Sequence, residues 1–244
     1  MKAMSRRRIL AVPDMHAPYH DEKVVRCLLR VAERCNVDEI VYIGDFCDFY
    51  SVSAHDKSPE RRENLEEELR GCRRLIRRFD RTGVKQHTYL GGNHEHRLAR
   101  YISRRAPELS ESIAGIPQLL ELDNLTEKWK YIPYRVPYKV GDATFIHDVG
   151  KSGVSAARAS YSVYRGKLII GHTHRAQFYS EGDGWCLNIG WGGAYEAIDY
   201  FPEHRARNEW QHAFGIVDMH KGVASPQLCL IDDKGKTTVD GQRI

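Results

Sequence analysis

Short apolar runs alternate with amphipathic segments along the first half of the chain, and this alternation limits its fold more than any other feature. A short apolar run that stops at a turn signal is typical of a buried strand, whereas apolar residues every three or four positions indicate a helix. The pattern predicts strands over 9–12, 38–43 and 84–90, and helices over 21–35, 59–80 and 94–106. Such an order is characteristic of a layered α/β domain with a largely parallel sheet.

The second half of the chain differs, because short strand-like runs follow one another with a single helical stretch near 152–165. The runs predicted as strands lie at 129–132, 135–140, 143–147, 168–170, 176–180, 185–189, 213–219 and 227–231. We expect this half to be richer in antiparallel strands. The chain has no Pro/Gly/Ser-rich linker and no internal repeat, so residues 1–244 are predicted to form a single domain with two mixed sheets.

Composition and charge exclude several classes of protein. Hydrophobic residues make up 41% of the chain and aromatic residues 10%, which excludes disorder of the whole chain. The 37 Lys and Arg residues exceed the 33 Asp and Glu residues by four. A net charge of +4 lets an anionic substrate approach but does not by itself indicate nucleic-acid binding.

The apolar runs and the cysteines suggest where the protein resides. Runs such as 9–12 are far shorter than the roughly 20 residues of a membrane-spanning helix, and this one is too short for the apolar core of a signal peptide. The six cysteines form no C-x-x-C pair, so we expect buried, reduced thiols. These features predict a cytoplasmic protein without membrane association.

Polar motifs follow five of the predicted strands at the point where each strand ends. They are Asp14-x-His16, Gly44-Asp45-x-x-Asp48, Gly92-Asn93-His94-Glu95, His147 and Gly171-His172-Thr173-His174. Sites in open α/β sheets form at the carboxyl ends of strands, so we expect these side chains to meet. Residues two apart in extended backbone project to the same side, which would pair Asp14 with His16, and His172 with His174.

Seven side chains of these motifs are candidate metal ligands: Asp14, His16, Asp45, Asn93, His147, His172 and His174. One divalent ion takes about four to six ligands, so seven suit two ions, with Asp45 as the candidate bridge. Oxygen and nitrogen donors without thiolate favour manganese, with iron, zinc, nickel or cobalt as alternatives. The sequence therefore predicts two divalent metal ions as cofactors.

In this order the motifs resemble those of the calcineurin-like metallophosphoesterase family, whose pattern is D-x-H, G-D-x-x-D, G-N-H-D/E, a lone His and G-H-x-H. The match spans residues 9–175, and the stretches 14–20, 44–51, 92–101 and 210–217 are similar to compact phage and prophage members. The resemblance implies a four-layer αββα sandwich of mixed sheets, with two metals between them.

The resemblance also implies a role for each motif residue. One metal would be held by Asp14, His16 and His174, and the other by Asn93, His147 and His172, with Asp45 bridging them. His94 would be the catalytic histidine that is not a ligand, and Asp48 its partner.

The expected activity is hydrolysis of a phosphoester, with a phosphodiester of nucleic acid or a nucleotide favoured. Two neighbouring cations can acidify a shared water, and the resulting bridging hydroxide would attack phosphorus while His94 protonates the leaving group. A phosphomonoesterase or protein phosphatase of the same fold is the first alternative, and a non-catalytic metal-binding scaffold the second.

Residues outside the motifs are candidates for substrate contact. Arg97, Arg175, His20 and His55 could contact the substrate or line its entrance, or could simply be surface and loop residues. Aromatic residues gather after the last motif, where they could form core or a lid, or stack on a nucleobase. They are Trp185, Trp191, Tyr195, Tyr200, Phe201 and Trp210.

Overall fold

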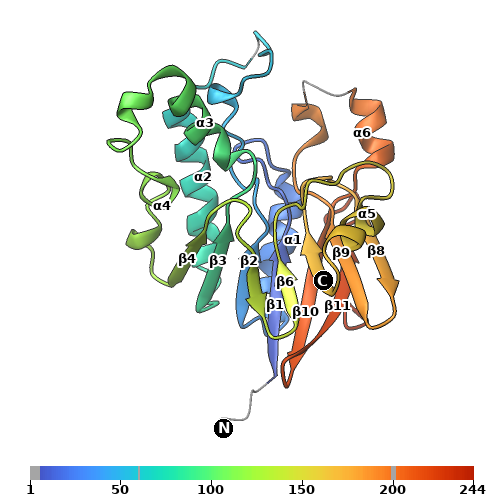
Figure 1. Ribbon diagram of the computed structural model, residues 1–244. Coiled ribbons are helices and arrows are strands. Elements are labelled where there is room, and N and C mark those ends of the chain that lie inside the picture. Colours follow the sequence, from blue (N-terminus) through green and yellow to red (C-terminus); the bar gives the residue numbers. More distant parts are fainter. Residues whose placement is uncertain (1–5, 60, 199–201) are drawn as a thin grey trace.

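A computed structural model describes residues 6–59, 61–198 and 202–244 (Figure 1). Its larger sheet has six strands in the order β11-β10-β1-β2-β3-β4. Strands β1 to β4 are parallel, and β10 and β11 extend the sheet in antiparallel pairing. Their bounds are β1 Arg7–Val12, β2 Glu39–Tyr42, β3 Gln86–Leu90, β4 Lys128–Ile132, β10 Ala213–His220 and β11 Val223–Leu230.

The second sheet has five strands in the order β5-β6-β7-β9-β8. The three inner strands are parallel, and β5 and β8 pair at the edges in antiparallel direction. The bounds are β5 Tyr138–Val140, β6 Ala143–Phe145, β7 Lys167–Ile170, β8 Ala176–Glu181 and β9 Gly184–Ile189. Antiparallel pairs do gather in the second half of the chain, as predicted, but β6, β7 and β9 form a parallel core that the sequence did not indicate. A two-stranded ribbon joins β12 Thr238–Val239 and β13 Gln242–Arg243.

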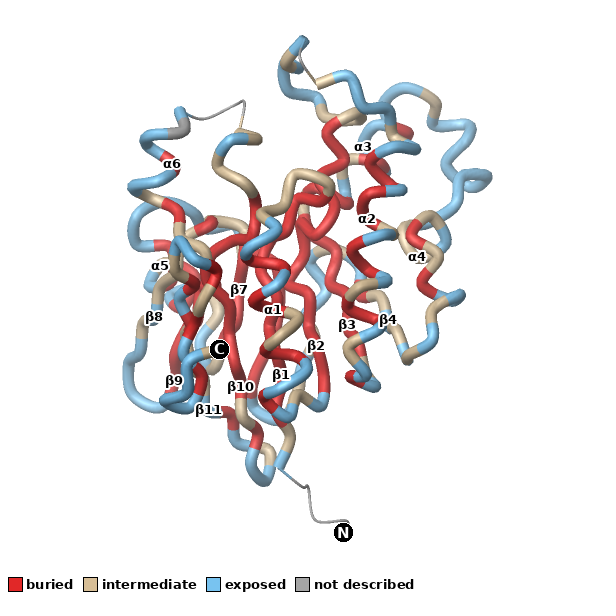
Figure 2. The backbone as a smooth tube through the Cα atoms, turned by 180° about the vertical axis from the view of Figure 1, so that it is seen from behind, coloured by how far each residue is buried: buried red, intermediate tan, exposed pale blue. Residues whose placement is uncertain are grey.

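Strand β1 shows how the layers stack, because its residues alternate between two cores. Leu10 and Val12 pack in the core that also contains apolar residues of helices α1 Glu22–Arg34, α2 Leu65–Asp80 and α3 Glu95–Arg105. Ile9 and Ala11 pack against the second sheet. Helix α5 Ala156–Val163 covers the outer face of that sheet. The layers are therefore helix, sheet, sheet and helix, which confirms the predicted sandwich; Figure 2 shows the buried strands inside and the exposed helix faces outside.

Several shorter elements complete the fold. They are the helices α4 Ile116–Leu119 and α6 Glu203–Glu209, and the 3-10 helices η1 Tyr50–Val52, η2 Pro107–Leu109, η3 Leu122–Asn124 and η4 Tyr195–Ala197. All six cysteines are buried and free, as predicted. Within the described residues, none of the helices has the length and apolar content needed to cross a membrane.

Helix α2 begins later than the sequence pattern predicted, at Leu65 rather than near residue 59. Asn64 sets this start, because its side chain accepts a hydrogen bond from the Glu67 amide while the Glu67 carboxylate accepts one from the Asn64 amide. Such a reciprocal capping box satisfies two amides that have no partner inside the helix.

Replacing the cap should destabilise the protein by a measurable amount. We expect Asn64→Ala to lower the free energy of unfolding by about 1 kcal/mol, because the first turn loses an acceptor. Asn64→Asp keeps the acceptor and should unfold like the wild type in a urea titration. Equal stability of the alanine variant and the wild type would show that the cap does not stabilise α2.

Candidate metal centre

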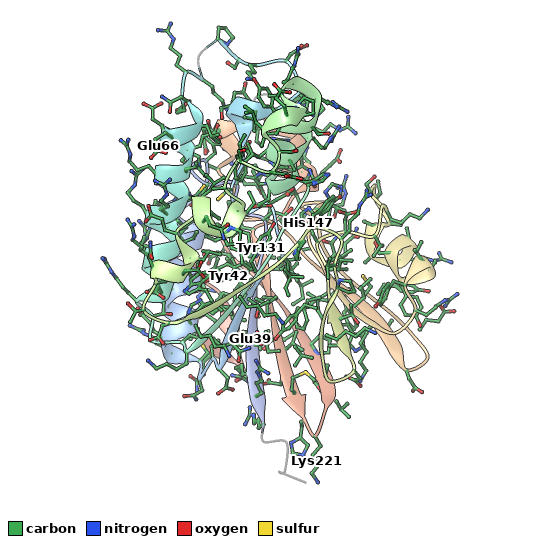
Figure 3. The ribbon with its side chains drawn as sticks, turned by 60° about the vertical axis from the view of Figure 1, so that its left-hand side comes forward. Glu39, Tyr42, Glu66, Tyr131, His147 and Lys221 are labelled. Atoms are coloured by element: carbon green, nitrogen blue, oxygen red, sulfur yellow. The ribbon has the colours of Figure 1, made fainter. Side chains whose placement is uncertain are left out.

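The polar motifs meet at one end of the two sheets, where β1, β2, β3, β6 and β7 present their carboxyl ends. Figure 3 shows His147 toward this end, Glu39 farther down the sheet and Lys221 at the opposite extremity. Among the described residues, three groups of side chains have ligand atoms that lie within 4.8 Å of one another, and one of these joins His16 with Asp48 and His94. The other two groups consist of predicted ligands alone. Of these two, the first contains Asp14, His16 and His174, and the second contains Asp45, His147 and His172.

The first group is fully enclosed and rich in acceptor atoms. His16 Nε2 lies 3.0 Å from His174 Nε2, and His174 Nε2 lies 3.5 Å from Asp14 Oδ2. The other carboxylate oxygen of Asp14, Oδ1, is buried without a hydrogen-bond partner. Buried polar atoms usually have partners, so an unpaired carboxylate oxygen beside two imidazoles fits a cation as its missing partner.

The second group gathers around His147 and includes Asn93. His147 Nε2 lies 2.9 Å from Asn93 Oδ1 and 3.2 Å from Asp45 Oδ2, and His172 Nδ1 lies 2.8 Å from the same Asn93 oxygen. His147 Nδ1 donates to the backbone oxygen of Ile43 at 2.8 Å, which leaves Nε2 free to act as a ligand. The structure thus brings all seven candidate ligands close together.

The electrostatics of the two groups also fit divalent cations. Burial raises the pKa of Asp14 to about 7, with the nearby carboxylate of Asp45 adding to the effect. Burial lowers the pKa of His147, but the Asp45 carboxylate outweighs it and raises that pKa to about 10. Asp45 therefore draws a proton onto a neighbouring ligand, and a cation competes with protons for such groups.

The backbone at the ligands differs from the extended form that the sequence suggested. His16, Asp45, His172 and His174 all have positive φ angles, between 46° and 70°. This left-handed conformation is uncommon for residues other than glycine and persists where the surrounding structure enforces it. The ligands are therefore aimed by tight turns rather than by the two-residue period of a strand.

Two motif glycines are required by close packing against ligands. A Cβ atom on Gly171 would lie 2.2 Å from Asp14 Oδ1, and one on Gly92 would lie 2.1 Å from Asp45 Oδ1. Both distances are far below contact between nonbonded atoms. These glycines let neighbouring strands approach closely enough for the two carboxylates to enter the centre.

Glu95 holds the loops around the centre in place, a role that the sequence analysis did not assign. Its carboxylate accepts hydrogen bonds from the amides of Asp45, Cys47 and Gly92, and from the hydroxyl of Tyr89. It therefore ties the loop after β2 to the loop after β3. The available signal was an acidic residue in the first turn of a predicted helix, where backbone amides are exposed.

His94 lies beside both groups and contacts Asp48 through the backbone oxygen of that residue. Its Nδ1 donates to the backbone oxygen of Asp48 at 2.9 Å, whereas the Asp48 carboxylate lies 3.7 Å from it and 3.1 Å from His16 Nδ1. Burial lowers the pKa of His94, but Asp45 and Asp48 outweigh burial and raise it above its ordinary value. Arg97 donates to His94 Nε2 at 2.8 Å and to Asp48.

A cavity of about 910 Å³ opens onto the centre. Of the predicted substrate contacts, His55, Arg97 and Arg175 line it, whereas His20 is not among the described residues that do. His20 instead lies 3.5 Å from Glu22, with most of its side chain buried. The sequence analysis missed Lys57, Arg61 and Ser152, which also line the cavity and come from irregular segments without a recognisable motif.

The aromatic residues after the last motif divide into two sets. Trp185 packs in the core between the sheets. Trp191 stacks on the His174 ring at 5.1 Å, and Trp210 meets it edge-on at 4.4 Å, so both hold this ligand in place. Trp210 also lines the cavity, and Tyr195 packs against Trp191. Tyr200 and Phe201 lie outside the described residues.

A family model described as calcineurin-like phosphoesterase matches residues 7–220. The chain belongs to this family. Two curated relatives of this phosphoesterase are the gene 54 proteins of mycobacteriophages L5 and D29. They are 25% and 27% identical, over 97% and 96% of this chain and 98% and 97% of their own. These relatives confirm the predicted likeness to phage members of the family.

The structure of vacuolar protein sorting 29 from Cryptosporidium parvum is similar in fold to this phosphoesterase. The two share 14% sequence identity with a TM-score of 0.50, over 98% of each chain. Likeness at this level of identity concerns the fold alone.

A methyl group on Gly171 should disturb the centre without disturbing the fold. We expect Gly171→Ala to weaken Mn²⁺ binding at least tenfold, because the added Cβ would lie 2.2 Å from Asp14 Oδ1 and push this oxygen aside. Isothermal titration calorimetry would measure this loss. Gly115→Ala is the matched control, because its added Cβ would lie 3.0 Å from the end of the Gln118 side chain and in ordinary contact with Pro117 at 3.7 Å. Unchanged binding by Gly171→Ala would contradict the assignment of Asp14 as a ligand.

Proposed function

We propose that this phosphoesterase is a phosphodiesterase that uses two divalent metal ions, with manganese favoured. The observation that carries the proposal is the cavity of about 910 Å³, where Asp45, Asn93, His172 and His174 meet His94 and a cationic wall. The wall contains Lys57, Arg61, Arg97 and Arg175. A centre of this kind beside cationic side chains suits an anionic phosphoester.

One ion would be held by Asp14, His16 and His174. The other ion would be held by Asn93, His147 and His172, and Asp45 would contribute to both. When bound, the ions would supply a water acidified to near neutral pH and charge neutralisation for the phosphoryl oxygens. The protein contributes the arrangement of these donors, held by the packing of Trp191 and Trp210 on His174 and by the hydrogen bonds to Glu95.

His94 is the group that would protonate the leaving oxygen. Its Nδ1 carries a proton, because the Asp48 carbonyl can only accept, so Nε2 is the atom that faces the reaction. In the structure Arg97 donates to Nε2. Protonated His94 and Arg97 cannot keep this contact, and a phosphate oxygen is a stronger acceptor for the guanidinium. A bound phosphoryl group would therefore draw Arg97 away and leave Nε2 free to hold the acid proton.

The cavity favours a diester over a monoester. Its cationic residues come from both sides of the centre, with Lys57 and Arg61 following β2 and Arg175 following β7. A diester has substituents on both sides of phosphorus, and such a cavity offers room and charge for each. The substrate of a phosphomonoesterase or a protein phosphatase has a single substituent on phosphorus, so it needs room on one side of the centre only.

Turnover measurements test the acid role of His94. With Mn²⁺ we expect hydrolysis of a phosphodiester with an alkyl leaving group, and chelation with EDTA should abolish it. His94→Ala should keep Mn²⁺ binding and lose about 10²–10⁴-fold in kcat, since proton transfer to a poor leaving group is lost. His96→Ala is the matched control, because His96 is exposed and lies outside the cavity.

Normal turnover by His94→Ala on the alkyl diester would contradict the acid role. A phosphomonoester and a phosphopeptide assayed beside the diester decide the substrate class. If the phosphomonoester or the phosphopeptide were hydrolysed faster than the diester, that compound would represent the substrate class instead. If none of the three substrates were hydrolysed with metal bound, the result would favour the non-catalytic scaffold.

A further inference from the structure

A second, smaller cavity of about 280 Å³ adjoins the one that opens onto the metal centre. Its walls are one face of helix α3 and the segment after η1, and it shares Ser53, His55 and Arg97 with the larger cavity. Figure 1 shows α3 and the segment that follows β2 at the same end of the molecule. The two cavities therefore form a continuous depression that leads away from the centre along α3.

The charge of this groove is uniformly positive. Arg100, Arg104 and Arg105 line it together with Arg97, and its lining includes no carboxylate. Arg97 is engaged with Asp48 and His94, but the structure shows no ion pair between Arg100, Arg104 or Arg105 and any described residue. By contrast, the exposed Arg77 and the half-buried Arg78 on α2 pair with glutamates. Three of the four guanidinium groups in the groove, those of Arg100, Arg104 and Arg105, therefore have no acidic partner among the residues that the structure describes.

The spacing of the groove residues follows one helix face. Arg97, Arg100 and Arg104 are three and four positions apart, which places them in a row, and the helical rise of about 1.5 Å per residue spreads the row over about 10 Å. Tyr101 lies in the same row and is 47% exposed, so its ring is accessible from the groove. Guanidinium groups that alternate with an exposed aromatic ring are the recognised means of holding a nucleic-acid strand.

We propose that this groove binds single-stranded nucleic acid on one side of the phosphodiester that the metal centre cuts. The proposal rests on the proposed function and names its substrate class. Arg100, Arg104 and Arg105 bind backbone phosphates beyond the scissile one, and Tyr101 stacks on an unpaired base. An acidic peptide has carboxylates for the arginines but no base for Tyr101, and a duplex keeps its bases paired and out of reach of the ring.

Binding of a fluorescent twelve-nucleotide thymidine strand, followed by anisotropy with EDTA present, tests the groove separately from catalysis. We expect Arg100→Ala combined with Arg104→Ala to weaken binding at least tenfold. The slope of log K against log salt should decrease by about 1.4, since each single-strand phosphate contact contributes about 0.7. The matched control is Arg26→Ala with Arg34→Ala, which removes two exposed arginines from α1, outside both cavities.

Variants of Tyr101 test the stacking contact separately from the charge of the groove. Tyr101→Ala should weaken binding about tenfold with no change in the salt slope, whereas Tyr101→Phe keeps the ring and should bind like the wild type. Thermal unfolding and Mn²⁺ binding of every variant confirm that the fold and the centre are intact.

Four results would overturn the proposal: an unchanged salt slope in the α3 variant, an equal loss in the α1 control, equal competition by a polyglutamate peptide, or tighter binding of a duplex. Because binding is measured without metal, absence of diester hydrolysis by the wild type would count against the proposed function and not against the groove.

Discussion

The burial of two carboxylates in one small space is the constraint on which this structure depends. Asp14 and Asp45 are almost completely buried between the sheets, among four histidines and an asparagine. Burying a carboxylate is unfavourable unless a counter-charge and hydrogen bonds compensate it. Burial raises the pKa of Asp14, and the nearby carboxylates outweigh burial and raise the pKa of His147, so both groups favour a positive charge in this space. Divalent cations supply it directly, and the chain is arranged to receive them.

The fold meets this constraint by bringing five strand ends to the same place. Parallel strands point their carboxyl ends the same way, so Asp14, Asp45 and Asn93 arrive from one sheet, and His147 and His172 from the other. The turns set the final positions of these side chains. Four of the candidate ligands have left-handed backbone, and Gly92 and Gly171 have no Cβ that would keep the carboxylates away. Glu95 then joins two of the loops through their amides.

Much of this arrangement could be predicted from the sequence. Apolar runs predicted the strands, and polar motifs at their ends predicted which side chains would gather there. The rest depended on contacts between distant segments. The capping box at Asn64 shortened the predicted helix, and the contact between the backbone oxygen of Asp48 and His94 depends on how the two loops pack. The groove along α3 forms only because the segment after η1 lies beside that helix, and no local pattern in either segment predicts the other.

The central claim is that the seven side chains hold two neighbouring cations. Anomalous diffraction from crystals soaked in Mn²⁺ tests it most directly. The account predicts two manganese peaks about 3.5–4 Å apart, one against Asp14, His16 and His174 and the other against Asn93, His147 and His172, with Asp45 contacting both. A single peak at saturating manganese, or peaks away from these side chains, would contradict it.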